Sequence, residues 1–290
     1  MNKFRGTGVA IVTPFKANNE VDFEGLENVT NHIINGKCEY IVILGTTGET
    51  ATLNKQEKQQ VVDTIKRVNN GRVPLVMGIG GNNTAEILET IAHFDFTGFD
   101  AVLSVSPYYN KPNQQGLIHH YTVIADACPV PVILYNVPGR TGSNMTAATT
   151  LTLAKHPNII GMKEASGNME QCMAIIKNKP DDFLVISGDD ALTLPLIGAG
   201  MDGVISVIAN AYPADWSEMV RLALAGDFVA ARKLHYKLLD LSITIFADGS
   251  PGGIKELLNY MNICGTHVRL PLYPVNDEVK NKLLDLAKNY

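Results

Sequence analysis

The stretch "YIVILGTT" at residues 40–47 has the composition of a β-strand that is buried on both faces. Its first five residues are apolar, and they do not alternate with polar residues as they would in a strand with one face in water. Continuous runs of this kind are typical of parallel sheets that helices cover on both sides. A glycine and two threonines follow at once, so the stretch predicts a buried parallel strand that ends in polar residues.

Seven further runs of this kind lie in the first two thirds of the chain. The centres of successive runs lie 20–35 residues apart, which is about the chain length that one strand and one helix need. Segments with helical periodicity, such as 22–35 and 55–69, lie between them. Eight such units predict an α/β fold, the (β/α)8 or TIM barrel, with an open doubly wound sheet as the alternative. The seven runs are "GVAIVTPF" (8–15), "PLVMGIGG" (74–81), "AVLSVSPYY" (101–109), "VPVILYNVP" (130–138), "IIGMKEAS" (159–166), "FLVISGDD" (183–190) and "DGVISV" (202–207).

The last part of the chain has a different pattern, which is wholly helical. Helical periodicity runs over 228–246, 254–262 and 276–288, with no further strand-like run between these segments. We therefore expect two parts, a catalytic barrel over residues 1–226 and a C-terminal helical extension over residues 227–290.

Charge and apolar patterning argue against several kinds of partner and compartment. The net charge is −5 and no basic cluster is longer than a dipeptide, so we expect no nucleic acid partner. No apolar run reaches the roughly 18 residues of a membrane span, and the start of the chain lacks a signal-peptide pattern. We expect a cytoplasmic protein with no membrane partner. The four cysteines, which are far apart in the sequence, are expected to be free thiols: Cys38, Cys128, Cys172 and Cys264.

Polar clusters follow five of the predicted strands. In a (β/α)8 barrel the active site lies at the carboxyl ends of the strands, so we expect these clusters on one rim. They are "GTTGET" (45–50), "SPYYNKP" (106–112), "YNVPGRTG" (135–142), "KEASGN" (163–168) and "SGDD" (187–190).

A lysine stands at the end of an otherwise apolar strand in "NIIGMKEASGN", residues 158–168. Burial disfavours the charged form of an amine, so Lys163 would be a neutral nucleophile toward carbonyl groups, which indicates Schiff-base chemistry. The alternative is a structural ion pair with Glu164 or another carboxylate. Adjacent strand residues point to opposite faces, which disfavours Glu164 as that partner.

Three other features of the rim allow both a functional and a structural interpretation. Tyr135 is either a core tyrosine or a proton carrier beside the lysine, in which case a threonine and a second tyrosine from "GTTGE" and "SPYYN" supply the rest of a relay. The backbone of "GTTGE" offers N–H groups to a carboxylate, or is a simple turn. Arg140 either binds a carboxylate or is solvated.

Metal and nucleotide motifs are weak. His119 and His120 are adjacent and therefore lie on different helix faces, and "GIGG" (78–81) lacks the full dinucleotide-binding spacing. Asp189 and Asp190 favour a capping or solvated role over a cation site. We expect no metal.

Four of these motifs, "GTTGE", "SPYYNKP", "YNVPGRTG" and "GMKEASGN", in this order and spacing resemble the dihydrodipicolinate synthase family, also called the 4-hydroxy-tetrahydrodipicolinate synthase family. The similarity covers nearly the whole chain. The resemblance implies a class I aldolase-type lyase that condenses pyruvate with L-aspartate semialdehyde through a Schiff base, in the diaminopimelate route to lysine. It also implies that no metal or organic cofactor takes part.

The resemblance also assigns roles to individual residues. Lys163 matches the Schiff-base lysine, and Tyr135, Thr47 and Tyr109 match a Tyr–Thr–Tyr proton relay. In the family the residue matching Tyr109 reaches into a neighbouring subunit, and the expected assembly is a homotetramer built as a dimer of dimers. The positions that match pyruvate-binding residues are Thr46, Thr47, Gly188 and Ile205.

Arg140 separates the close relatives. An arginine in the context "YNVPGRTG" suits an aldehyde that carries its own carboxylate, as aspartate semialdehyde does. Lyases of sialic or keto-deoxy sugar acids share the lysine and tyrosine and generally lack this arginine. A sugar-acid lyase and a non-catalytic barrel remain the competing hypotheses.

A regulatory lysine site is implied at a further set of positions. Regulated members commonly carry histidines where this chain has Lys55 and Lys58, and two ammonium groups would repel a bound lysine. We therefore expect lysine inhibition to be weak or absent. The matching positions are Thr50, Ala51, Lys55, Lys58, Asn82, Glu86 and Tyr108.

Overall fold

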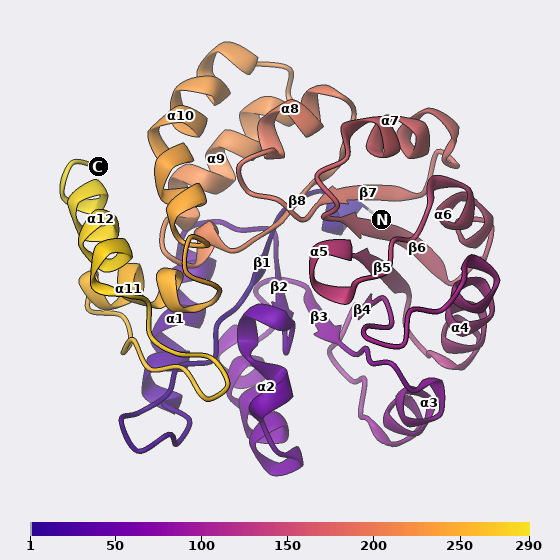
Figure 1. Cartoon of the computed structure of the whole chain (residues 1–290), viewed down its shortest axis with the longest axis horizontal. Coiled ribbons are helices and arrows are strands. Elements are labelled where there is room, and N and C mark those ends of the chain that lie inside the picture. Colours follow the sequence, from indigo (N-terminus) through magenta and orange to yellow (C-terminus); the bar gives the residue numbers. More distant parts are fainter. Residues whose placement is uncertain (1) are drawn as a thin grey trace.

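The computed structural model describes residues 2–290, with side chains from residue 3, and has eight parallel strands that close into a barrel in chain order (Figure 1). The predicted TIM barrel is therefore confirmed, and the open sheet is not formed. The first strand begins earlier than the run at 8–15, at Gly6, and is shorter because it ends at Ala10. The strands are β1 (Gly6–Ala10), β2 (Tyr40–Ile43), β3 (Leu75–Gly78), β4 (Ala101–Val105), β5 (Val132–Asn136), β6 (Ile159–Glu164), β7 (Leu184–Ser187) and β8 (Gly203–Ser206).

Helices surround the barrel, and Figure 1 shows them as an outer ring. Two of them are short and were not predicted: α5 is a single turn within the Arg140 motif, and α8 carries Pro195 within its six residues. Segments this short hold too few residues for the apolar ones to recur with the period of a helix. The helices of the ring are α1 (Phe23–Asn35), α2 (Lys55–Asn69), α3 (Thr84–His93), α4 (Gln114–Ala127), α5 (Pro138–Thr141), α6 (Ala147–Leu153), α7 (Met169–Asn178), α8 (Thr193–Gly198) and α9 (Pro213–Leu224), with the 3-10 turns η1 (Asn2–Phe4), η2 (Thr46–Gly48), η3 (Thr50–Thr52) and η4 (Ile208–Asn210).

The strand register decides which side chains enter the barrel. Tyr135 of β5 pairs with Lys163 of β6, and Lys163 pairs with Ile186 of β7. Tyr135 and Ile186 belong to the apolar cluster that fills the lumen, together with Ile205. Because paired residues share a face of the sheet, Lys163 also points inward and the next residue along β6 points outward.

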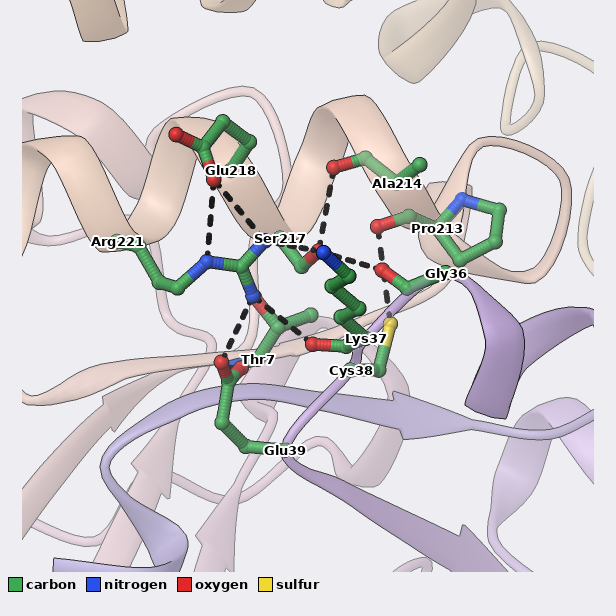
Figure 2. A network of polar contacts seen from close by, with 10 residues as sticks. All are labelled: Thr7, Gly36, Lys37, Cys38, Glu39, Pro213, Ala214, Ser217, Glu218 and Arg221. Atoms are coloured by element: carbon green, nitrogen blue, oxygen red, sulfur yellow. Dashed lines mark hydrogen bonds and ion pairs between the residues drawn. The ribbon is translucent and has the colours of Figure 1, made fainter.

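A network of polar contacts links α9 to the chain at the opposite end of the barrel, where β1 and β2 begin (Figure 2). Arg221 of α9 donates to Glu39 Oε1 at 3.0 Å and to the carbonyl of Lys37 at 2.9 Å. Glu39 Oε2 accepts the N–H group of Thr7 at 2.6 Å. These bonds join one helix to two strands at the end of the barrel away from the predicted site, so we interpret them as structural.

The C-terminal extension contains α10 (Phe228–Thr244), α11 (Gly252–Tyr260) and α12 (Asp277–Lys288). Figure 1 shows these helices beside the barrel, next to α1 and α9, and α10 packs against α9. We propose that the boundary between the barrel and the C-terminal extension lies between residues 226 and 227. No helix among residues 2–290 has both the length and the apolarity that crossing a membrane requires.

The four cysteines are free, as predicted, and all four are buried. Burial raises the pKa of the Cys172 thiol to about 11, with a contribution from the nearby Glu164 carboxylate. Burial likewise raises the pKa of Cys264 to about 12. Protonated buried thiols are poor nucleophiles, so they take no part in the chemistry considered below.

Candidate active site

The five polar clusters lie at one end of the barrel. Each follows the carboxyl end of a strand, and all eight strands run in the same direction, so the clusters meet on one rim. "GTTGET" forms η2 and η3 after β2, and the arginine of "YNVPGRTG" lies in α5 after β5. The prediction of a common rim is confirmed.

Lys163 is buried in the barrel and has no ionic partner. Its side chain is 5% exposed, and Nζ lies 4.4 Å from the centre of the Tyr135 ring. Within residues 2–290, no carboxylate lies within 4.0 Å of this amine and no hydrogen bond uses it. The structural ion pair considered as the alternative is therefore not formed, and the amine faces an aromatic ring and an apolar lumen.

Glu164 points to the outer face, as the strand alternation predicts. Its carboxylate accepts the backbone N–H group of Ser166 at 2.7 Å and the side-chain amide groups of Asn136 and Gln171, each at 3.0 Å. Asn136 also accepts the N–H group of Met145 at 2.9 Å. This buried network joins the outward residues directly after Tyr135 and Lys163, and so it holds the two inward side chains in register.

Gly188 lies against the lysine. A Cβ atom at this position would come 2.9 Å from Lys163 Cε and 2.6 Å from the Cβ atom of Ala165. The Ala165 atom is fixed to the backbone, whereas the lysine stem can move. Glycine is therefore the residue that allows Lys163 to keep its position. Among the predicted site residues, the structure brings Lys163, Tyr135 and Gly188 together.

The turn after β2 leaves two backbone donors free. Gly48 and Glu49 donate to the carbonyl groups of Gly45 and Thr46, which closes the turn. Among the described residues, the N–H groups of Thr46 and Thr47 have no acceptor. Thr46 is exposed and Thr47 is buried at 6% exposure. The arrangement provides donors for an anion at the rim.

Tyr109 and Arg140 are exposed on the same rim. Tyr109 is 87% exposed and has a left-handed backbone with φ 71°, and its N–H group donates to the carbonyl of Thr141 at 3.2 Å. This bond ties the loop after β4 to α5. The Arg140 side chain makes no hydrogen bond or ion pair with the described residues. No hydrogen bond among them joins Tyr135, Thr47 and Tyr109, so the relay stays a prediction.

Two further residues considered from the sequence, Ile205 and Asp190, are buried. Ile205 of β8 is buried in the lumen at 1% exposure. Asp190 accepts the N–H groups of Val207 and Ile208, both at 2.9 Å, and burial raises its pKa. This is the capping role that the sequence favoured over a cation site. No group of three or more histidine, cysteine or acidic side chains in residues 2–290 is arranged to hold a metal ion.

The positions of the expected regulatory site lie along η3, α2, α3 and the loop after β4. The side chain of Asn82 donates to the carbonyl of Tyr108 at 3.1 Å, and that of Asn110 donates to the carbonyl of Asn82 at 2.9 Å. Lys55 and Lys58 lie in the first turn of α2, and their ammonium groups have no hydrogen-bond partner or carboxylate among the described residues. Thr50 and Ala51 belong to η3, and Glu86 is exposed in α3.

Three buried charged residues near the site were not assigned from the sequence. Glu49 and Lys255 form an ion pair, and Glu164 has the outward role described above. The available signal was a charge within an apolar or glycine-rich context, as in "GGIKELL". That signal shows that a partner is needed but does not identify it.

A TIM barrel with a buried, unpaired lysine at the carboxyl end of β6, beside a tyrosine on β5, defines a lyase of the class I aldolase type. The chain belongs to the dihydrodipicolinate synthetase family, whose model matches residues 3–290.

Individual relatives agree with this assignment over nearly the full length. A 4-hydroxy-tetrahydrodipicolinate synthase of Flavobacterium psychrophilum is 54% identical over 284 residues, which cover 98% of this chain and 97% of that protein. The crystal structure of dihydrodipicolinate synthase from Aquifex aeolicus has a TM-score of 0.95 at 39% identity, covering 99% of this chain and 98% of that one. The chloride-inhibited enzyme from Acinetobacter baumannii, solved in complex with pyruvate, has a TM-score of 0.95 at 40% identity, covering 98% of each chain.

The contact at Gly188 yields a test of the lysine position. In Gly188→Ala the new methyl group displaces the Lys163 stem, and misplacing a nucleophile by about 1 Å lowers the rate of its reaction by about a hundredfold. We expect this loss in the rate at which Lys163 forms an imine with a 2-oxo acid, measured by single-turnover borohydride trapping. The clash with the Ala165 Cβ atom should also lower the urea midpoint, so trapping is measured without urea on the folded variant, and an unchanged trapping rate would contradict the assigned contact.

Proposed function

We propose that this protein condenses pyruvate with L-aspartate semialdehyde through an imine on Lys163, as a 4-hydroxy-tetrahydrodipicolinate synthase in the diaminopimelate route to lysine. The observation that carries the proposal is the Lys163 amine, which is buried and unpaired 4.4 Å from the centre of the Tyr135 ring. Lysine is the side chain that forms imines with carbonyl substrates, and no ionic partner among the described residues engages this amine. The relative from Acinetobacter baumannii is described in complex with pyruvate.

The first steps use Lys163 and a proton carrier. The Lys163 nitrogen attacks the keto carbon of pyruvate, and the hydroxyl group of the resulting carbinolamine leaves as water after protonation. The imine then loses a methyl proton and becomes an enamine. Tyr135 lies against the amine and supplies the phenol that moves these protons, with Thr47 and Tyr109 completing the relay.

Pyruvate is held by its carboxylate and its methyl group. The free N–H groups of the Thr46–Thr47 turn and the two threonine hydroxyls bind the carboxylate. Gly188 and Ile205 line the pocket beside the lysine, where Gly188 leaves the space and Ile205 supplies an apolar surface.

The second substrate is selected by Arg140. The guanidinium is exposed on the rim and has no acidic partner in the described chain, so it is available to the carboxylate of the semialdehyde. The enamine carbon attacks the aldehyde carbon. The amino group of the semialdehyde then attacks the imine carbon and releases Lys163, which returns the free amine. No step requires a metal or an organic cofactor.

The active unit is proposed to be an oligomer, a homotetramer built as a dimer of dimers in the cytoplasm. Tyr109 supports this part of the proposal, because an aromatic ring that is 87% exposed beside a catalytic rim is suited to contact another chain. The left-handed backbone of Tyr109 and its bond to Thr141 hold the ring away from its own barrel.

Borohydride trapping tests the imine directly. With pyruvate, the reductant should attach a stable three-carbon adduct to Lys163, which peptide mass spectrometry locates. Lys163→Ala should remain folded, show no adduct and lose nearly all condensation with L-aspartate semialdehyde, because the other buried lysine among residues 3–290, Lys255, is paired with Glu49. An adduct at another lysine, or none in the active wild-type protein, would reject the mechanism.

Mixing two inactive variants tests whether Tyr109 acts in a neighbouring subunit. Lys163→Ala and Tyr109→Phe are each expected to be nearly inactive alone. If Tyr109 acts across the interface, reassembly of a one-to-one mixture creates complete sites and restores about a quarter of the wild-type activity. If it acts in its own chain, no site becomes complete and the mixture stays inactive.

The regulatory positions give a further expected outcome. Lys55 and Lys58 have no neutralising partner in the described chain, so their charges oppose the ammonium groups of a bound lysine. We expect half-inhibition by L-lysine only at millimolar concentrations or above in a steady-state assay. Replacing both residues by histidine should strengthen inhibition, and submillimolar inhibition of the wild-type protein would contradict the expectation.

A further inference from the structure

A buried ion pair connects the C-terminal extension to the turn that carries Thr46 and Thr47. Glu49 comes directly after this turn, and its Oε1 accepts a hydrogen bond from Lys255 Nζ of α11 at 2.6 Å. Both side chains are 0% exposed. The second oxygen of Glu49, Oε2, accepts the N–H group of Arg269 at 3.0 Å. Both oxygens of this carboxylate are therefore held by residues more than 200 positions away in the chain.

The cation is held as firmly as the anion. Lys255 Nζ also donates to the carbonyl of His267 at 2.7 Å and lies 4.5 Å from the centre of the Phe15 ring. Burial lowers the pKa of Lys255, and the Glu49 carboxylate opposes that shift. A buried ammonium group with a carboxylate, a carbonyl and an aromatic ring around it has one defined position.

Arg269 extends the connection to the next helix. Its guanidinium bonds both carboxylate oxygens of Glu57 in α2, at 2.6 and 2.9 Å, and donates to the carbonyl of Thr52 at 2.9 Å. The segment 255–269 thus holds three consecutive elements, η2, η3 and the start of α2. No other part of the extension has buried polar bonds to the rim among the described residues.

The backbone of Glu49 explains why the turn needs this support. Glu49 has φ 52° and ψ 35°, a left-handed conformation that is unfavourable for residues other than glycine. In this conformation its N–H group closes η2 on Thr46, and its carbonyl accepts both the N–H and the hydroxyl group of Thr52. The direction of the Thr46–Thr47 donors therefore depends on a strained residue whose side chain is fixed from outside the barrel.

We propose that Lys255, through Glu49, is a positioning residue for pyruvate, which makes the C-terminal extension part of the substrate-binding apparatus. The proposal rests on the function proposed above, in which the Thr46–Thr47 turn binds the pyruvate carboxylate. Lys255 does not touch the substrate. It holds Glu49 in the left-handed conformation that aims the two threonines at the substrate. A buried ion pair generally adds little net stability, so structural support alone does not account for it.

The test compares pyruvate binding in Lys255→Met with pyruvate binding in the wild-type protein. Methionine keeps most of the length of the side chain and removes the charge. We expect the pyruvate concentration for half-maximal borohydride trapping at Lys163, and the KM for pyruvate, to rise by about tenfold or more. The KM for L-aspartate semialdehyde should stay within about twofold of the wild-type value, because Arg140 lies in α5 on a separate loop. This split between the two substrates is not expected from general destabilisation.

Two further variants make the result decisive. Arg221→Met breaks an ion pair and hydrogen bonds at the opposite end of the barrel, so it should lower the urea midpoint without changing pyruvate half-saturation. The double variant Glu49→Gln with Lys255→Met leaves no unpaired buried charge and therefore folds more readily than the single variant. It should still show the raised pyruvate half-saturation, because the amide does not replace the ionic contact.

The outcomes separate the inference from the function on which it rests. A folded Lys255→Met or double variant with pyruvate half-saturation within about twofold of wild type would overturn the inference alone, provided that the wild-type protein is trapped at Lys163. A wild-type protein that pyruvate and borohydride do not modify at Lys163 would overturn the proposed function itself. A raised half-saturation for pyruvate alone, in both variants and not in Arg221→Met, supports the inference.

Discussion

The candidate active site depends on one constraint, the burial of the Lys163 amine inside a closed barrel. Lys163 has no carboxylate within ion-pair distance in the described chain, and its surroundings are an apolar lumen and the face of the Tyr135 ring. The amine is therefore available to react with a carbonyl group and is not engaged in a structural ion pair. The barrel must close, and its strands must keep register, for the amine to stay in this environment. The rest of the site can be understood as the means of holding that arrangement.

Buried polar networks outside the lumen provide this support. On one side Glu164 and Asn136, which follow Lys163 and Tyr135 along their strands, bond to each other, and Glu164 also accepts a hydrogen bond from Gln171. On the other side Glu49 and Lys255 connect the turn after β2 to the C-terminal extension. In both cases a buried carboxylate has its oxygens satisfied by groups from other elements. Each network lies behind residues that we propose to face the substrate, which would separate the positioning of the site from its chemistry.

Local patterns predicted much of the architecture and some of its details. The continuous apolar runs identified eight strands, and α2 has the bounds that its periodicity indicated. Patterns failed where elements are short: α8 contains a proline, and α5 is a single turn. Strand alternation also predicted that Lys163 and Glu164 would face opposite sides. It did not predict the partners of Glu164, because Asn136 and Gln171 are brought near it only by strand pairing and helix packing.

The sequence by itself determined the barrel, the rim that carries the polar clusters and the presence of a lysine within an apolar strand. These properties follow from the period of apolar residues and from chain direction, both of which are local. The tertiary structure alone decided that Lys163 lies over the Tyr135 ring, that Gly188 makes room for it, and that Lys255 pairs with Glu49 across 206 positions of sequence. These contacts depend on barrel closure and on the packing of the extension, and no local period records which distant residues will meet.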